Sequence, residues 1–447
     1  MVSAQYQCVD VNQGSQAERL YFAVMASAET IFDVGKAGCD IITREQAQET
    51  TRTADGADSA SDVPVKPVKA ASTRSPWNRK NPYRAIVLAN NLLSGPESDK
   101  EVRHYSLSLG DSGIEYQAGD GLGVKPVNNP ELVDALIGRL GVGPDTTITV
   151  KNSQNRLDEL LTHSYEIGVP SVDLIEAVAA RTGDAELRSV LEADDRATLH
   201  AWAWGKDVLD VLAIDGSLAL DPVELLGLLR PLQHRVYSIS SSPLTHQGTV
   251  DLTVASVRYR SAERDRGGVC STFLADRLTE GETAGVFLTA NKSFRLPTDD
   301  AAPVIMVGPG TGVAPFRAFL HDRRARGASG RNWLFFGDQH RGSDFIYEDE
   351  LRSFSHAGIL TRLDLAFSRD QSEKIYVQHR MRENGKELYS WLEEGAHFYV
   401  CGGMDMGKDV DSALREIVVE HGGLTDGQAE DYVAELKSSK RYLRDVY

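Results

Sequence analysis

Four apolar, strand-like runs in the C-terminal third of the chain each end in residues that can hold part of a nucleotide. The runs lie at 303–307, 332–337, 361–368 and 397–403, and the stretches behind them are 308–312 (GPGTG), 338–350, 368–376 (SRDQSEKIY) and 401–403 (CGG). Open α/β sheets bind ligands at the carboxyl ends of their strands, so these stretches are expected to meet at one edge. Four matched strand ends in one module predict a pyridine-nucleotide site.

The glycine-rich stretch 308–312 lies between an apolar run and a helical pattern. Small residues let the backbone approach a ligand, and the following helix offers the positive end of its dipole. Gly310 and Thr311 are therefore candidate nucleotide contacts. The spacing is not the GxGxxG of a Rossmann fold, nor a P-loop, because no Lys-Ser/Thr pair follows. A purely structural strand–turn–helix connection is the alternative.

Two cations and two hydroxyls gather after the third run, at Ser368, Arg369, Lys374 and Tyr376. This set suits a 2′-phosphate, and an arginine can also stack on adenine. An NAD enzyme favours a carboxylate on the ribose instead. Acidic residues at 370 and 373 lie inside the cluster, so a solvated charged loop is the alternative. We favour NADP over NAD.

The segment RVYS at 235–238 lies in a strand pattern. Side chains alternate across a sheet, so Arg235 and Tyr237 share one face, and Val236 and Ser238 share the other. Arg235 can neutralise a pyrophosphate, Tyr237 can stack on a flat ring, and the Ser238 hydroxyl can reach a ring nitrogen. An ordinary barrel strand followed by a serine turn is the alternative.

A second phosphate-seeking element is GGVCST at 267–272, which leads into a helical pattern at 273–277. Glycines followed by hydroxyls at a helix N-terminus form an anion site. Alone, the segment also fits a simple helix start. Together with RVYS it suits a dinucleotide with an aromatic ring to stack, such as a flavin.

Two features near the C-terminus have both a plain and a functional interpretation. Cys401, at a strand end, is either a small buried residue or a group near the reacting ring. The ending RYLRDVY at 441–447 is rich in aromatic and charged groups. Chain ends usually fray, but a tail of this kind can dock.

The elements that must position these residues follow from the hydrophobic periodicity. Residues 1–76 are predicted to be an extension that ends in a linker rich in Thr, Ala, Asp, Pro and Lys, with one amphipathic helix at 17–31. Strand patterns at 84–91, 102–109, 234–240, 249–259 and 285–290 predict an antiparallel barrel, and helical spacing at about 130–230 predicts an insert in it. From 297 to 447 strands alternate with helices at 315–326, 347–357, 376–394 and 406–421, which indicates a parallel-sheet α/β domain.

Composition excludes several classes of protein. The chain has 447 residues and a net charge of −17, which argues against nucleic-acid partners and anionic membrane surfaces. No apolar stretch approaches the roughly 20 residues of a membrane span, and no secretory signal is visible. The four cysteines form no CxxC pair, so no metal site is predicted, and scattered thiols fit the cytoplasm.

Over about residues 77–447 the segments RVYS, GVCS at 268–271, GPGTG, SR…KIY, CG at 401–402 and the ending RDVY resemble the ferredoxin–NADP reductase superfamily. Within it, the likeness is to the diflavin reductase group, and most of all to the reductase half of the sulfite reductase flavoproteins. The resemblance implies FAD in the barrel and NADPH on the C-terminal domain. It implies flavin contacts from Ser94, Asn128, Arg235, Val236, Tyr237, Ser238, Thr253, Val254, Ala255, Tyr259, Gly268, Val269, Cys270, Ser271 and Tyr447, and NADPH contacts from Gly310, Thr311, Ser368, Arg369, Lys374, Ile375, Tyr376, Val377, Gln378 and Asp409.

The resemblance also places Ser238, Cys401 and Asp445 beside the hydride path and stacks Tyr447 on the flavin ring. The chain departs from the family pattern at Gly403, where the family has aspartate, and the run to Asp409 is one residue shorter. The first 76 residues are too few for a flavodoxin-like FMN domain and lack its phosphate loop. An external electron acceptor is therefore expected.

The resulting prediction is an FAD-dependent NADPH reductase that serves as the flavoprotein component of an assimilatory sulfite reductase. Its acceptor is a flavodoxin-like FMN protein, a ferredoxin, or a sulfite or nitrate reductase subunit. One alternative is a ferredoxin or flavodoxin–NADP reductase that works toward NADPH. A non-enzymatic alternative is a degenerate subunit that keeps the fold as a scaffold.

Overall fold

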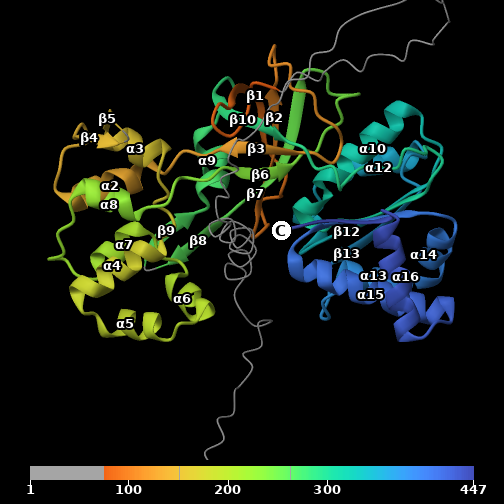
Figure 1. Ribbon diagram of the computed structural model, residues 1–447. Coiled ribbons are helices and arrows are strands. Elements are labelled where there is room, and N and C mark those ends of the chain that lie inside the picture. The colour runs from red at the N-terminus through yellow and green to blue at the C-terminus, as the bar shows by residue number, and fades with distance from the viewer. Residues whose placement is uncertain (1–74, 151, 262) are drawn as a thin grey trace, which may run out of the picture.

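The computed structural model describes residues 75–150, 152–261 and 263–447. An antiparallel barrel lies between a helical insert and a parallel α/β domain (Figure 1). The predicted fold class is therefore confirmed. The helix expected at 17–31 and nearly all of the predicted extension lie outside the described residues.

The barrel is a six-stranded antiparallel sheet in the order β6-β3-β10-β1-β2-β7. It closes between its two edge strands through a bridge from Ile239 to Leu252 and a bond of 2.9 Å from the Ser240 amide to the Asp251 carbonyl. Alternate side chains fill its interior, as in a small barrel. The strands are β1 (Tyr83–Leu92), β2 (Glu101–Ser108), β3 (Gly121–Lys125), β6 (Arg235–Ser238), β7 (Thr249–Ser256) and β10 (Thr283–Thr289); the hairpin β8 (Arg258–Ser261) and β9 (Arg264–Gly267) precedes helix α9 (Val269–Arg277).

The helical insert leaves the barrel after β3 and returns at β6. Side chains of Ser, Asp or Asn cap the N-termini of most of its helices, which explains why short segments are helical. Its leucine-rich faces form a separate core. Its elements are α2 (Pro130–Leu140), β4 (Thr147–Val150), β5 (Ser153–Arg156), α3 (Leu157–His163), α4 (Val172–Thr182), α5 (Ala185–Glu192), α6 (Arg196–Ala203), α7 (Val208–Ala213) and α8 (Pro222–Leu228).

The α/β domain is built on a five-stranded parallel sheet in the order β13-β12-β11-β14-β15. Helices α10 and α12 cover one face, and α13, α15 and α16 cover the other (Figure 1). Its strands are β11 (Val304–Val307), β12 (Asn332–Asp338), β13 (Arg362–Phe367), β14 (His397–Gly402) and β15 (Tyr442–Val446). Its helices are the 3₁₀ turn η3 (Gly310–Val313), α10 (Ala314–Arg326), α11 (Arg341–Asp344), α12 (Glu348–His356), α13 (Val377–Glu383), α14 (Gly385–Glu393), α15 (Met404–Gly422) and α16 (Asp426–Ser438).

The barrel and the α/β domain share one hydrophobic core. Phe294, just after β10, is fully buried and stacks on Phe319 of α10 with ring centroids 5.6 Å apart. Its edge also meets Tyr399 of β14 at 5.5 Å. The barrel and the α/β domain, the two lobes of the molecule, are therefore fixed to each other beside the parallel sheet.

Two elements end earlier than the sequence patterns predict. The strand expected at 249–259 breaks at Val257, because its amide bonds to the Ser271 hydroxyl and its carbonyl accepts from the Gly268 amide. The helix expected at 376–394 is two helices that meet at Asn384, whose side chain bonds to Asp364 of β13. Local side-chain and loop bonds outweigh the periodicity at both places.

Candidate functional site

The parallel sheet has its topological switch point between β11 and β14. Connections from these adjacent strands run in opposite directions along the sheet, which leaves a crevice at their carboxyl ends. Gly312 lines this crevice so tightly that a β-carbon there would lie 2.2 Å from the carbonyl oxygen of Cys401. Only glycine fits at that approach. The glycine-rich segment and Cys401 are therefore brought together, as the sequence predicts for one site.

Helix N-termini at this edge are suited to an anion. Among the described residues, no side chain caps the first turn of η3, α10 or α15, and Gly403 is the N-cap of α15. Free main-chain amides and the helix dipole attract phosphate groups at such termini, although the first amide of α15 is taken by the Tyr447 carbonyl. By contrast, most helices of the insert are closed by Ser, Asp or Asn side chains. The residues at the switch point fit a dinucleotide.

The two lobes meet at the three residues predicted beside the hydride path. Ser238 lies in barrel strand β6, while Cys401 and Asp445 are paired neighbours on β14 and β15. The Ser238 hydroxyl donates a hydrogen bond of 2.8 Å to the Asp445 carboxylate. Burial raises the pKa of the Asp445 carboxyl, and this bond partly offsets the rise. Burial, with the negative charge of Asp445, raises the pKa of the Cys401 thiol well above its usual range, so the thiol is neutral at pH 7.

The C-terminal tail docks as strand β15 and ends between the two lobes (Figure 1). The Tyr447 amide bonds to the Gly402 carbonyl at 3.0 Å, and the Met404 amide bonds to the Tyr447 carbonyl at 3.2 Å. The Tyr447 hydroxyl lies 3.1 Å from that of Thr311. The side chain of Tyr447 is still 40% exposed. An aromatic ring is thus held at the edge of the crevice without being packed into a core.

The predicted flavin residues of β6 point in different directions. Tyr237 packs at the barrel core, while Val236 is 47% exposed. The Arg235 guanidinium bonds to the carbonyl oxygens of Gln233 and His234, and its charge lies 3.8 Å from Glu166. Arg235 remains partly exposed. Its role as a pyrophosphate ligand stays a prediction.

The N-terminus of α9 is the second anion-binding feature. Its N-cap is Gly268, and no described side chain closes its first turn. The Ser271 hydroxyl is directed to the Val257 amide at 3.1 Å. Cys270 is buried in the barrel, where burial raises the pKa of its thiol to about 11. The backbone amides of 269–271, and not the side chains, therefore suit the phosphates of FAD.

An ion-pair cluster holds the β8–β9 hairpin that leads into α9. Arg266 pairs with Asp207 and, at 2.7 Å, with Asp210, and both acids lie at the N-terminus of α7 in the insert. Arg264 adds a bond of 2.9 Å to Asp207. The insert thereby fixes the segment that carries Gly268.

Several other predicted flavin residues are engaged inside the protein. The Ser94 hydroxyl bonds to the Val102 amide, the Asn128 side chain bonds to the carbonyls of Leu161 and Tyr165, and the Thr253 hydroxyl bonds to that of Tyr347. Val254 is buried in the barrel core, Ala255 packs against the core shared with the α/β domain, and Tyr259 faces Trp204 of the insert. Their contacts with FAD stay predictions.

The predicted 2′-phosphate residues lie at the carboxyl end of β13. The amides of Ser368 and Arg369 bond to the carbonyls of Asp338 and Gln339, which ties this loop to the end of β12. Lys374 is exposed and Tyr376 is 37% exposed. Ile375, before helix α13, and Val377, its first residue, contact the core, and the Gln378 side-chain amide donates to Asp409 at 3.1 Å.

Buried oxygens without a partner mark the same edge. One carboxylate oxygen of Asp338 and the side-chain oxygens of Gln339 and Gln378 have no hydrogen-bond partner among the described residues. Buried polar atoms without a partner also occur elsewhere in the described residues, and at this edge they leave acceptors free for a polar ligand. The ribose and adenine groups of a nucleotide supply hydrogen-bond donors of this kind.

The sequence analysis missed the loop between β1 and β2, which crosses from the barrel to this edge. Lys100 pairs with the buried carboxylate of Asp338, and Asp99 pairs with Arg369 at 2.7 Å. The polar segment 338–350, predicted to line the nucleotide, contributes the side chains of Asp338 and Asp344 and the carbonyl of Ser343 to this contact between lobes. Nothing in the local pattern of a short polar loop signals which domain it touches.

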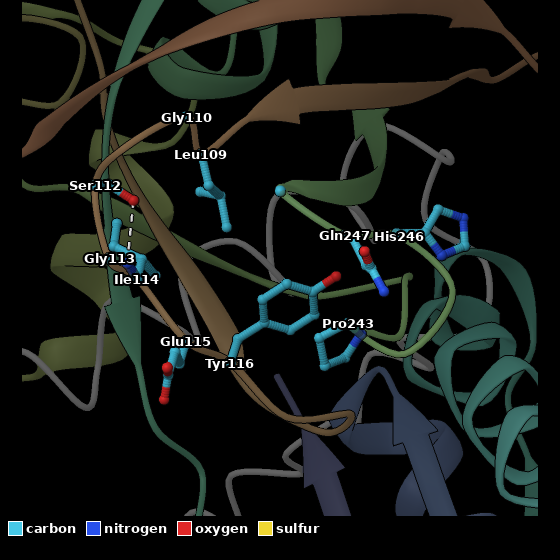
Figure 2. Close-up of a pocket in the computed structure, with 11 residues that line it drawn as sticks. Leu109, Gly110, Ser112, Gly113, Ile114, Glu115, Tyr116, Pro243, His246 and Gln247 are labelled. Atoms are coloured by element: carbon cyan, nitrogen blue, oxygen red, sulfur yellow. Dashed lines mark hydrogen bonds between the residues drawn. The ribbon is translucent and has the colours of Figure 1, made fainter.

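Two hollows in the described part of the chain lie away from the switch point, and the second is partly lined by the polar segment 338–350. One of about 420 Å³ lies beside Tyr116, between the β2–β3 connection and the turn at Pro243 to Gly248 (Figure 2). Another of about 480 Å³ is lined by His104, Arg317 and Glu350. Within the part of the chain that the structure describes, no helix has the length and apolar character to cross a bilayer. Nor does that part hold a cluster of His, Cys, Asp and Glu arranged to bind a metal ion.

Comparisons with known proteins match two family models to separate parts of the chain. Residues 75–273 match the FAD binding domain model, and residues 306–412 match the oxidoreductase NAD-binding domain model. The chain is 42% identical over 416 residues to the sulfite reductase (NADPH) flavoprotein alpha-component of Bacillus subtilis strain 168, which covers 92% of this chain and 69% of that protein. It is 45% identical to the protein of that name from Vibrio cholerae and 43% identical to that from Klebsiella pneumoniae, over 84% and 83% of this chain and 61% and 62% of theirs. The chain thus spans about two thirds of the length of these curated relatives.

Proposed function

We propose, from the premise that this chain belongs to the family of sulfite reductase (NADPH) flavoprotein alpha-components, that it is an FAD-dependent NADPH reductase. It takes electrons from NADPH and passes them to a separate electron-transfer protein. The names of its relatives favour a sulfite reductase subunit as that acceptor. We place this activity in the cytoplasm.

One observation carries the proposal. The Ser238 hydroxyl of the barrel lies 2.8 Å from the Asp445 carboxylate of the α/β domain, beside Cys401 of β14 and two residues before the terminal tyrosine. This contact joins the two domains at the point where we propose that nicotinamide and flavin meet. When bound, FAD supplies the redox chemistry, since it accepts a hydride from NADPH and can release electrons singly.

The protein's own residues position the reactants and hold protons. Ser238 holds its proton at Oγ, within reach of Asp445. Cys401 is fully buried and neutral, so it adds no charge behind the crevice. Tyr447, held at its backbone by Gly402, covers the crevice edge and must move aside for nicotinamide. Arg369 and Lys374 supply the positive charge for the 2′-phosphate.

The acceptor is proposed to dock where the crevice opens to solvent. Val236, Met404 and Tyr447 are large apolar side chains that are each 40–47% exposed, on elements that reach the crevice. The net charge of −17 favours an acceptor with a positive face. Association should therefore weaken as salt increases.

The full chain, loaded with FAD, provides the test. Anaerobic stopped-flow absorbance at the flavin band should show rapid bleaching by NADPH and much slower bleaching by NADH. A variant with Ser238→Ala should keep its FAD but be reduced by NADPH more slowly. Ser353→Ala, on the exposed side of α12, should change neither the FAD content nor the rate of reduction.

Two results would overturn the proposal. One is a chain that retains no FAD after reconstitution. The other is a chain with stoichiometric FAD that neither NADPH nor NADH reduces, which would favour a scaffold role. The acceptor is tested separately, by mixing the reduced chain with a sulfite reductase haemoprotein and following sulfide formation.

A further inference from the structure

The loop that joins β1 to β2 in the barrel is anchored on the nucleotide-binding edge of the α/β domain. The Gly95 amide bonds to the Ser343 carbonyl at 2.6 Å, and the Ser98 hydroxyl bonds to Asp344. Lys100 pairs with Asp338, whose carboxylate is 1% exposed. Contacts on both sides of residue 99 thus fix the loop in place.

Asp99 projects from this anchored loop onto a predicted NADPH residue. Its carboxylate accepts a hydrogen bond of 2.7 Å from the Arg369 guanidinium. The backbone of Arg369 is held at the carboxyl ends of β12 and β13 by its bond to Gln339 at 2.9 Å. The pair therefore joins two rigid supports that belong to different lobes.

We propose that Asp99 is a counter-ion that the 2′-phosphate of NADPH displaces from Arg369. This inference rests on the proposed function, because it requires Arg369 to bind that phosphate. Carboxylate and phosphate compete for the same face of a guanidinium group. The phosphate carries nearly two negative charges and repels a carboxylate held beside it. Binding of the nucleotide must therefore break a contact between the lobes.

The consequence is weaker and more readily reversed binding of the 2′-phosphate. Asp99 is 59% and Arg369 is 38% exposed, so solvent screens the pair and the effect is modest. Replacing Asp99 by asparagine keeps a hydrogen-bond acceptor and removes the charge. We expect it to tighten binding of 2′-phosphorylated nucleotides about 2- to 5-fold. Nucleotides without the phosphate should bind unchanged.

Isothermal titration of the full, FAD-loaded chain with 2′,5′-ADP and with 5′-AMP tests this inference. Asp99→Asn should lower the dissociation constant of 2′,5′-ADP and leave that of 5′-AMP unchanged. Glu97→Gln, an exposed site in the same loop, removes the same charge and should have no effect. The gain from Asp99→Asn should shrink in high salt, because the removed interaction is electrostatic.

A double-variant cycle separates this inference from the proposed function. Arg369→Gln should sharply reduce the preference for 2′,5′-ADP, with Lys374 keeping the remainder, and adding Asp99→Asn to it should then change nothing. If Arg369→Gln leaves the preference intact, the NADPH site itself is misassigned. If Arg369→Gln reduces the preference but Asp99→Asn binds 2′,5′-ADP like the wild type, only the counter-ion role fails. Equal gains for 2′,5′-ADP and 5′-AMP would also overturn that role.

Discussion

Arg317 in helix α10 makes a buried polar link between the barrel and the α/β domain. Its guanidinium makes two hydrogen bonds of 2.6 and 3.1 Å to Glu350 of α12. It also reaches into the barrel, where it bonds to the Ser240 carbonyl at 2.8 Å and to the Asp251 carboxylate at 3.0 Å. Arg317 is 8% exposed and Asp251 is 2% exposed. The cluster is therefore largely removed from water.

Replacing Arg317 by methionine keeps much of the volume and removes the cation from the buried Asp251 and from Glu350, whose side chain is 28% exposed. Removing one partner from a buried ion pair costs about 3–5 kcal/mol, because the remaining charge stays unsolvated. We expect a loss of this size in the free energy of unfolding near neutral pH. Arg352→Met, which breaks an exposed pair with Glu348 on the same helix α12, should cost less than about 0.5 kcal/mol.

The pH dependence gives the sharper test. Burial alone would raise the pKa of Glu350, but bonds from His321 and Arg317 outweigh it and lower that pKa to about 2. In the wild type the ionised Glu350 therefore contributes to the free energy of unfolding. This contribution is fully present above the unfolded pKa of 4.5 and is lost only as pH falls toward 2. Without Arg317 the pKa of Glu350 rises, so its carboxyl protonates in mild acid. The loss in the free energy of unfolding caused by the substitution then becomes smaller.

Urea denaturation followed by tryptophan fluorescence, at about pH 8 and about pH 5, measures both effects. The difference between wild type and Arg317→Met should be largest at the higher pH. A destabilisation below about 1 kcal/mol, or one of equal size at both pH values, would refute the reasoning from buried charge.

Three further outcomes follow from the same contacts. Ser238→Ala removes the donor to Asp445 and should slow flavin reduction by NADPH about 10- to 100-fold in anaerobic stopped-flow, without loss of FAD. Arg266→Met breaks the ion pairs that tie the β8–β9 hairpin to the insert and should raise the dissociation constant of FAD about 10-fold, measured by flavin fluorescence. Burial lowers the pKa of His104 and His246 below 6.5, so stability should be full above about pH 6.5 and fall with acidification in thermal melts.

The periodic parts of the fold could be predicted from the sequence. The run 304–307 is apolar at every position because β11 is buried on both faces, and it is followed directly by Gly308 and the glycine-rich turn. Alternation in 84–91 predicted β1 to within one residue at each end. These signals are local, so no knowledge of the partner element is needed to detect them.

The parts that the sequence did not predict depend on contacts between distant residues. Asn128 matches a flavin position by resemblance, but its side chain bonds to the carbonyls of Leu161 and Tyr165 in the helical insert. The Asp99–Arg369 pair joins residues 270 positions apart. Neither partner carries a pattern that identifies the other.

The segment between β12 and α12 explains how the nucleotide site and the lobe contact come to share residues. It follows a parallel strand, so it lies at the ligand-binding edge, and its polar sequence suits a nucleotide. Yet its Asp338, Ser343 and Asp344 bond to the β1–β2 loop, and its Tyr347 hydroxyl bonds to Thr253 and His104 of the barrel. One connection thus both borders the predicted nucleotide and sets the distance between the lobes. Because hydride transfer needs the two rings in contact, a change in this connection should alter the rate of flavin reduction even where it touches neither cofactor.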